Sequence, residues 1–217
     1  MTTFVNTPFG ALEGTEQDGV YRFLGVPFAE KPLGELRFRA PQMVRPWTET
    51  RQATGYEKDP MQANLVLGPE HYSEDCLYLN LWVPETTAKK LPVMVWVPGG
   101  AFATGGSGAV DPEGPSIYDC QQLAKDGGCI VVSISYRLNV FGFLNLSQFS
   151  SRFDDNIGMR DIIMALRWVQ EAIASFGGDP ENVTLVGESA GGEAISALLL
   201  IDEAKPYFHK AIIESNC

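Results

Sequence analysis

The pentapeptide Gly187-Glu188-Ser189-Ala190-Gly191 has the residue types of a nucleophilic site, at the spacing G-x-S-x-G. In that motif the serine lies on a tight turn between a strand and a helix, which exposes its hydroxyl. Residues two positions either side must lack a Cβ because the turn is narrow, and Gly187 and Gly191 satisfy this requirement. The pattern predicts that Ser189 is a nucleophile. The alternative is a glycine-rich turn that only packs a helix against a sheet.

The flanking residues favour the first interpretation. An apolar, β-type run at 183–186 precedes the motif, and a run of small and apolar residues at 193–200 with helical character follows it. The N–H group of Ala190 therefore lies at a helix start, where free N–H groups and the helix dipole attract an anion. We expect this N–H group to face a negative charge that develops near Ser189.

The rest of the chain predicts the elements that would position this turn. Strands are expected at 77–83, 91–97, 129–135, 183–186 and 211–213, and helices at 116–125 and 161–176. The strand at 91–97 is nearly all apolar, which predicts burial on both faces, and Ser116 is a candidate N-cap. Strands and helices alternate from residue 91 onward, which predicts a parallel α/β sheet. Residues 4–24 predict a small antiparallel meander, and 29–75 are loop-rich.

Composition excludes several classes of function. The 217 residues carry 27 acidic and 16 basic side chains, a formal net charge of −11, which argues against nucleic acid and anionic membranes as partners. No apolar run approaches the roughly 18 residues of a membrane span, and the first residues lack the features of a secretory signal. Four cysteines without C-x-x-C spacing and two histidines predict no metal site. We expect a cytoplasmic protein.

Several further stretches resemble the N-terminal part of the type-B carboxylesterases, the cholinesterase-like branch of the α/β-hydrolases. They occur in that family's order over the whole length, and with the elbow they are far more specific than the elbow alone. They are Phe23-Leu24-Gly25-Val26-Pro27-Phe28-Ala29, Leu36-Arg37-Phe38, Ser73-Glu74-Asp75-Cys76-Leu77-Tyr78-Leu79-Asn80, Gly99-Gly100-Ala101-Phe102, Ser135-Tyr136-Arg137, Ala165-Leu166-Arg167-Trp168-Val169 and Phe176-Gly177-Gly178-Asp179-Pro180.

The resemblance implies an α/β-hydrolase fold: a mostly parallel central sheet with flanking helices and the small N-terminal meander. It implies that residues 1–217 are the N-terminal portion of one such domain. It also implies Ser189 as the nucleophile and an oxyanion hole formed by the N–H groups of Gly100, Ala101 and Ala190. Glu188 matches a carboxylate in the wall of the family's active site. No metal or organic cofactor is implied, the partner is a small ester substrate, and the oligomeric state is left open.

Three features depart from the family's pattern. Pro98 and Ala101 stand where many relatives have histidine and a third glycine, and Met61 replaces one half of an early disulfide with Cys76. Only 28 residues follow Ser189, so the family's acid and histidine are expected beyond residue 217. His71 and His209 are predicted to be solvated or capping residues. The hypothesis is a serine ester hydrolase present as an inactive fragment; the alternatives are a non-catalytic binding module or a truncated product.

Overall fold

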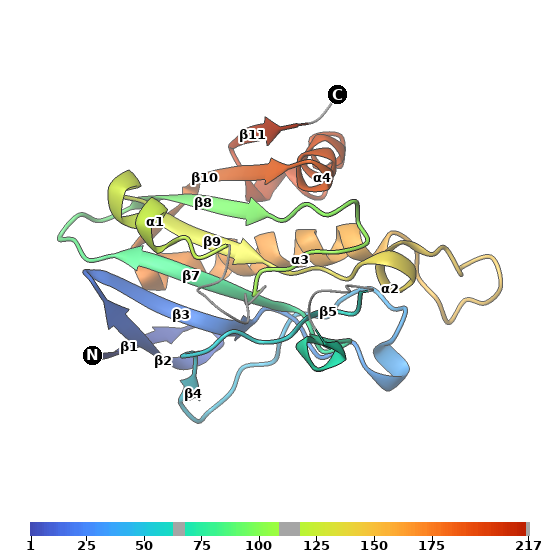
Figure 1. Cartoon of the computed structure of the whole chain (residues 1–217), viewed down its shortest axis with the longest axis horizontal. Coiled ribbons are helices and arrows are strands. Elements are labelled where there is room, and N and C mark those ends of the chain that lie inside the picture. The colour runs from blue at the N-terminus through green and yellow to red at the C-terminus, as the bar shows by residue number, and fades with distance from the viewer. Residues whose placement is uncertain (63–67, 109–117, 216–217) are drawn as a thin grey trace.

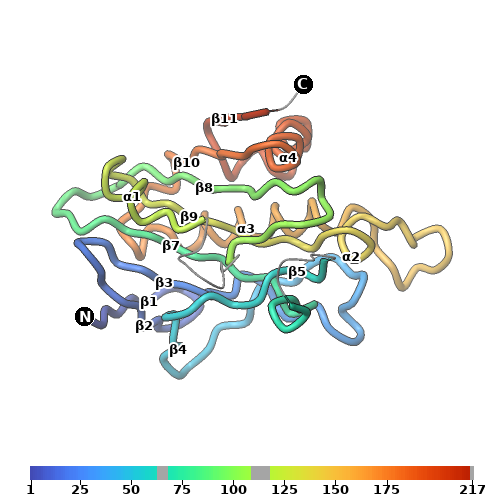
Figure 2. The backbone as a smooth tube through the Cα atoms, viewed as in Figure 1, coloured from blue at the N-terminus to red at the C-terminus, as the bar shows by residue number. Residues whose placement is uncertain are grey.

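The computed structural model describes residues 1–62, 68–108 and 118–215. Within these ranges, one mixed sheet of nine strands runs through the molecule in the order β1-β2-β3-β7-β9-β8-β10-β11, with β4 beside β2. Figure 2 shows the blue strands near the N-terminus at one edge of the sheet and the red strand β11 at the opposite edge. The α/β fold expected from the alternating pattern is confirmed.

The N-terminal strands form the antiparallel half of this sheet. Strands β1 (Thr2–Thr7), β2 (Gly10–Gln17) and β3 (Val20–Pro27) make the predicted meander, which continues through β3 into β7 (Tyr78–Pro84). The meander is thus an extension of the central sheet and not a separate unit. The loop-rich stretch that follows it contains only short strands and 3-10 turns, namely β4 (Arg51–Gln52), β5 (Asp59–Pro60), β6 (Tyr72–Ser73), η1 (Gly34–Leu36) and η2 (Pro69–His71) among its described residues.

The C-terminal strands form the parallel half. Strand β9 (Ile130–Ile134) pairs parallel with β8 (Leu91–Val97), β8 with β10 (Gly178–Glu188), and β10 with β11 (Lys210–Glu214). The parallel arrangement predicted from residue 91 onward is therefore confirmed, while β7 joins β9 antiparallel. Because the four strands point the same way, the loops that leave their carboxyl ends meet at one edge of the sheet.

Helices cover both faces of the sheet (Figure 1). Helix α1 (Gln121–Gly127) lies on one face, over a small core that includes Trp82, Ala124 and Val131. The larger core lies on the other face, beneath α3 (Ile157–Ala172) and α4 (Ala190–Leu198). The remaining helical segments are α2 (Asn139–Phe143) and the 3-10 turns η3 (Ile173–Phe176) and η4 (Lys205–Tyr207).

Two local predictions were wrong. The helix expected over 116–125 begins at Gln121, and residues 118–120 are not helical, because the Asp119 Oδ1 atom accepts the Gln121 N–H at 2.9 Å and fixes the start there. The proposed N-cap, Ser116, lies outside the described residues. Strand β8 is not buried on both faces: Met94 and Trp96 are half-buried, because α1 packs mainly over β3, β7 and β9.

Candidate active site

Ser189 occupies a strained turn between β10 and α4. Its backbone has φ 55° and ψ −122°, a combination that residues with a Cβ rarely adopt. Two hydrogen bonds hold it there: the Ser189 N–H donates to the Glu214 carbonyl, and the Ser189 carbonyl accepts from the Glu193 N–H, both at 2.9 Å. The strand–turn–helix context expected of a nucleophile elbow is present.

The glycines of the motif lie where no side chain fits. A Cβ at Gly187 would come within 2.6 Å of the Gly191 carbonyl carbon. A Cβ at Gly191 would come within 2.1 Å of the Val97 carbonyl oxygen and 3.1 Å of the Pro98 carbonyl carbon. Because these neighbours are backbone atoms, they cannot move aside as a flexible side chain would. The motif therefore needs glycine at both positions to close the turn and to bring it against the end of β8.

The loop that leaves β8 lies directly against this turn. The parallel register pairs Gly187 with Val97, so the residues that follow each strand leave the sheet side by side. A Cβ at Gly99 would lie 2.6 Å from the Glu188 carbonyl oxygen, which shows how closely the two backbones approach. The fold thus places the loop that carries Gly100 and Ala101 next to the turn that carries Ser189.

This loop has an unusual backbone. Gly100, Ala101 and Phe102 have φ values of 110°, 56° and 56°, three positive values in succession. Within the ranges that the structure describes, the N–H groups of Gly100, Ala101 and Ala190 donate no hydrogen bond to another protein group. Backbone N–H groups left free at a helix start and in such a turn form a natural site for an anion.

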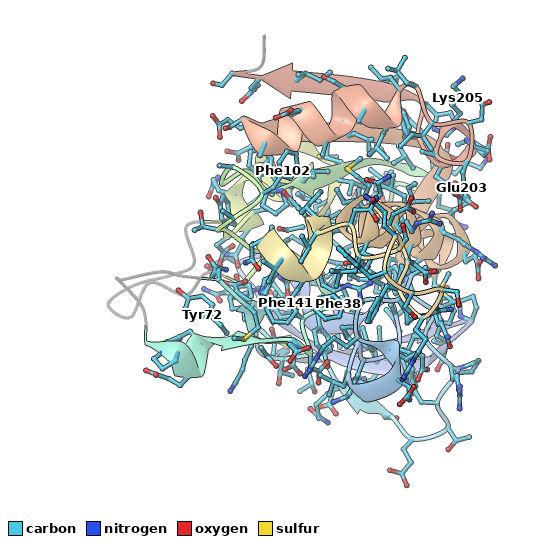
Figure 3. All side chains as sticks on the ribbon, turned by 90° about the vertical axis from the view of Figure 1, so that its right-hand side faces the viewer. Phe38, Tyr72, Phe102, Phe141, Glu203 and Lys205 are labelled. Carbon is cyan, nitrogen blue, oxygen red and sulfur yellow. The ribbon has the colours of Figure 1, made fainter. Side chains whose placement is uncertain are left out.

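Aromatic side chains support the loop. The buried Tyr136 hydroxyl donates to the Pro98 carbonyl at 2.8 Å. The Phe102 ring packs against Phe143 with 4.7 Å between centroids and lies edge-on to Tyr136 at 6.5 Å. Figure 3 looks onto this end of the molecule, where Phe102 is labelled. The sequence did not assign Tyr136 to the site, although its place just after β9 puts it at the same edge of the sheet.

A buried ion pair fixes β9 to α3 beneath these residues. Asp161 accepts three hydrogen bonds from Arg137, at 2.6 Å from Nη2, 2.8 Å from Nε and 3.0 Å from the backbone N–H. The two side chains are 0% and 4% exposed, so neither charge is solvated and each depends on the other. The sequence reasoning missed this pair. The signal available in the sequence was Asp161, a charged residue on the apolar face of the helix predicted over 161–176.

Glu188 lies half-buried beside the loop, with its Oε2 atom 3.2 Å from where a Gly99 Cβ would stand. Burial, followed by the negative charge of Glu188, raises the pKa of the Tyr118 phenol, so the carboxylate and this ring face the same region. A carboxylate in this position lends negative potential to the site, which suits the role in the site wall that the sequence predicts for Glu188.

Neither histidine lies beside Ser189. The His209 Nδ1 atom accepts the Val183 N–H at 3.2 Å, in the middle of β10. Ser189 lies six positions further along the extended chain, a distance of about 20 Å. His71 lines a different pocket, with Tyr56 and Asp59, and its Nε2 atom lies 3.6 Å from Glu70. Within the described residues, neither imidazole makes a hydrogen bond with Ser189.

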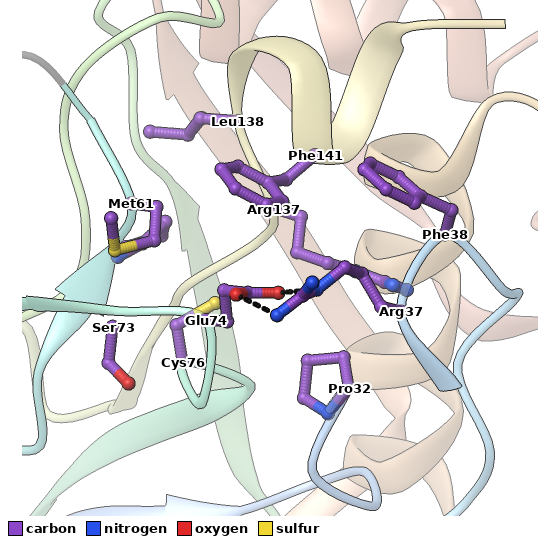
Figure 4. A pocket seen from close by; sticks show the side chains of 11 residues that line it. Pro32, Arg37, Phe38, Met61, Ser73, Glu74, Cys76, Arg137, Leu138 and Phe141 are labelled. Carbon is purple, nitrogen blue, oxygen red and sulfur yellow. Dashed lines mark hydrogen bonds and ion pairs between the residues drawn. The ribbon is translucent and has the colours of Figure 1, made fainter. Parts of the chain in front are cut away.

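The position of the family's early disulfide holds a free thiol, as the replacement of one half by Met61 predicts. Cys76 is buried and unpaired, burial raises its pKa, and Met61 lines the same small pocket (Figure 4). Arg37 and Glu74 form two hydrogen bonds of 2.5 and 2.6 Å across this pocket. The pair is partly exposed, so we expect it to contribute little stability.

Metal-ligating side chains do not cluster in the described part of the chain. Its histidine, cysteine, aspartate and glutamate side chains form no group of three or more that could hold a metal ion. None of its helices has both the length and the apolar composition needed to cross a bilayer.

Comparison with known proteins gives a consistent family. The model of the carboxylesterase family matches residues 1–217. The para-nitrobenzyl esterase of Bacillus subtilis is 45% identical over 217 residues, which are 98% of this chain and 43% of that protein. The liver carboxylesterase of Sus scrofa is 44% identical over 221 residues, which are 95% of this chain and 37% of that protein.

Solved structures agree with the sequence relatives. A para-nitrobenzyl (PNB) esterase superimposes with a TM-score of 0.91 at 45% identity, covering 100% of this chain and 44% of that one. A carboxylesterase of Geobacillus stearothermophilus gives 0.90 at 42% identity, covering 99% and 43%. The chain thus spans less than half the length of the relatives that it matches.

Proposed function

Because the chain belongs to the carboxylesterase family, we propose that it forms the N-terminal portion of a serine carboxylic-ester hydrolase domain, with Ser189 as its nucleophile. The observation that carries this proposal is the placement of a strained serine between the loop after β8 and the start of α4, both of which carry free N–H groups. Strain of this kind persists only where surrounding contacts impose it, and it is typical of catalytic sites. The name of the Bacillus subtilis relative suggests para-nitrobenzyl esters as one kind of substrate.

The proposed reaction has two stages. The Ser189 oxygen attacks the ester carbonyl while a base removes its proton, and the new oxyanion is held by the N–H groups of Gly100, Ala101 and Ala190. The carbonyl reforms as the alcohol leaves with that proton, which gives an acyl-serine. Water then adds by the same route and releases the carboxylic acid. Preformed donors for the oxyanion are worth roughly a hundredfold or more each in rate, so the free N–H groups suit the task.

The base and its orienting acid are proposed to come from residues outside these 217. His209 bonds to Val183 in the middle of β10, and His71 lines a pocket with Tyr56 and Asp59. A serine hydroxyl without a base is a weak nucleophile. The 217 residues alone are therefore expected to hydrolyse esters very slowly.

The test compares the 217-residue chain with a chimera. In the chimera, residues 1–217 are continued by the C-terminal part of the Bacillus subtilis relative, which aligns along 98% of this chain. Both proteins are treated with a fluorophosphonate probe and a p-nitrophenyl ester. Labelling and turnover are expected only in the chimera, and both should disappear in Ser189→Ala. The exposed Ser175 provides the matched control, since Ser175→Ala should change neither result.

Each outcome separates the proposal from its alternatives. Rapid turnover by the 217-residue chain, if it depends on Ser189, would refute the proposal that the base lies outside these residues. A folded chimera that neither reacts with the probe nor turns over the ester would favour a binding module. A chain that fails to fold by itself would favour a truncated product. The cytoplasmic location expected from the sequence stays a prediction.

A further inference from the structure

The strained loop after β8 needs support from outside itself. Ala101 and Phe102 both have a Cβ and both have positive φ, so an isolated loop would relax toward commoner conformations. Hydrogen bonds within the loop supply part of the restraint, since the Gly100 carbonyl accepts the N–H groups of Ala103 and Thr104 at 3.0 and 2.9 Å. These bonds close the turn but do not fix its direction relative to Ser189.

Gln62, from the loop after β5, holds the far side of the turn. Its amide makes a pair of bonds with one residue: Nε2 donates to the Gly105 carbonyl at 2.7 Å, and Oε1 accepts the Gly105 N–H at 2.9 Å. Nε2 also donates to the Pro60 carbonyl at 3.0 Å, which fixes the orientation of the amide. A Cβ at Gly105 would lie 2.5 Å from the Gly99 carbonyl, so Gly105 packs directly on the start of the loop.

Asn139 holds the near side and connects to the same segment. Its backbone N–H donates to the Phe102 carbonyl at 2.7 Å. Its side-chain Nδ2 donates to the Met61 carbonyl at 2.6 Å, directly before Gln62. Its own φ of 46° is one that asparagine tolerates better than most residues. Asn139 thereby fixes Met61 to α2, while the adjacent Gln62 bonds to Gly105 in the turn.

We propose that Gln62 is a positioning residue for the oxyanion loop, with Asn139 anchoring the segment that carries it. The proposal rests on the function proposed above for Gly100 and Ala101. Gln62 does not contact the reacting atoms; it acts through Gly105 and Gly99, which set the direction of the two N–H groups. Without it the loop relaxes, and the N–H groups no longer meet the oxyanion at the distance that stabilises it. The neutral ester carbonyl accepts weaker hydrogen bonds from these N–H groups than the oxyanion does. Binding of the ester should therefore weaken less than binding of the transition state.

The first test is kinetic and uses the chimera. Gln62→Met keeps the side-chain length and removes all three hydrogen bonds. We expect kcat to fall about 10- to 100-fold, because a displacement of about 1 Å at a catalytic group has that effect. KM should change by less than about twofold, because an interaction made mainly in the transition state has been lost. Gln122→Met is the matched control, since the exposed Gln122 side chain donates to Asp126 within α1, and it should leave both parameters unchanged.

The second test does not need activity. Amide hydrogen exchange is measured on the 217-residue chain, and Gln62→Met should speed exchange at residues 99–106 while β9 and β10 keep their protection. Gln62→Glu, when ionised, sets a carboxylate oxygen against the Gly105 and Pro60 carbonyl oxygens, so it should give an effect at least as large as that of Gln62→Met in both tests. This second variant, with a urea midpoint for each protein, separates loosening of the loop from a general loss of stability.

The outcomes distinguish this inference from the proposed function. An active chimera whose kcat is unchanged by Gln62→Met, or whose KM alone rises, overturns the positioning role of Gln62. Unchanged exchange at 99–106 overturns it as well, whatever the kinetics show. A chimera without any Ser189-dependent activity refutes the proposed function, and the exchange experiment then decides alone whether Gln62 holds the loop.

Discussion

Replacing Ser189 with glycine should make the chain more stable than replacing it with alanine. Both variants lack the hydroxyl, but Ser189→Ala keeps a Cβ at φ 55° and ψ −122°, whereas glycine adopts that conformation without strain. The strain at such a position costs about 1–3 kcal/mol. Glycine loses more backbone entropy on folding, which offsets about 0.5–1 kcal/mol of the gain. The expected advantage of glycine over alanine is therefore about 1–2 kcal/mol.

Urea unfolding of the 217-residue chain measures this difference directly, and a thermal scan should show a shift of about 2–4 °C for each kcal/mol in a chain of this size. Ser196, in the interior of α4, provides the control. At that ordinary helical position the same comparison should have the opposite sign, with glycine about 1 kcal/mol less stable than alanine. Equal stabilities at position 189, or an alanine variant that is the more stable, would show that the turn is not strained and would remove the main support for the proposed nucleophile.

Three further predictions concern the surroundings of the site. Burial raises the pKa of Asp59 from 3.8 to about 6, so the folded state loses stability as pH rises through this interval. Asp59→Asn should therefore increase the free energy of unfolding by up to about 3 kcal/mol above pH 6 and leave it unchanged below pH 4, as measured by urea midpoints against pH. Asp161→Ala leaves a buried guanidinium unpaired and should cost about 3–5 kcal/mol, while Asp202→Ala, at an exposed pair, should cost less than about 1 kcal/mol in the same urea assay. Gly191→Ala puts a Cβ 2.1 Å from a backbone oxygen and should abolish probe labelling in the chimera, whereas Gly55→Ala, which meets no neighbour within 4 Å, should leave labelling intact.

Much of the fold could be predicted because its signals are local. The apolar runs of β8, β9 and β10 and the 3.6-residue period of α3 appear in short windows of sequence, and both were found close to their observed positions. The errors arose where a nonlocal contact or a single side chain decided the outcome. Asp119 starts α1 later than its composition suggests, and the half-exposed face of β8 depends on where α1 packs.

The candidate site divides in the same way. The sequence by itself determined the elbow, because G-x-S-x-G encodes a backbone shape that only glycine neighbours permit, and the run of resembling segments determined the family. Only the tertiary structure decided that β8 and β10 are neighbours, which brings Gly99 against Glu188. It also decided that the side chains or backbones of Gln62, Tyr136 and Asn139 support the loop after β8. Such contacts join residues tens of positions apart, and their partners are backbone groups that every residue possesses. No pattern of side chains along the chain can therefore reveal them before the strands are paired.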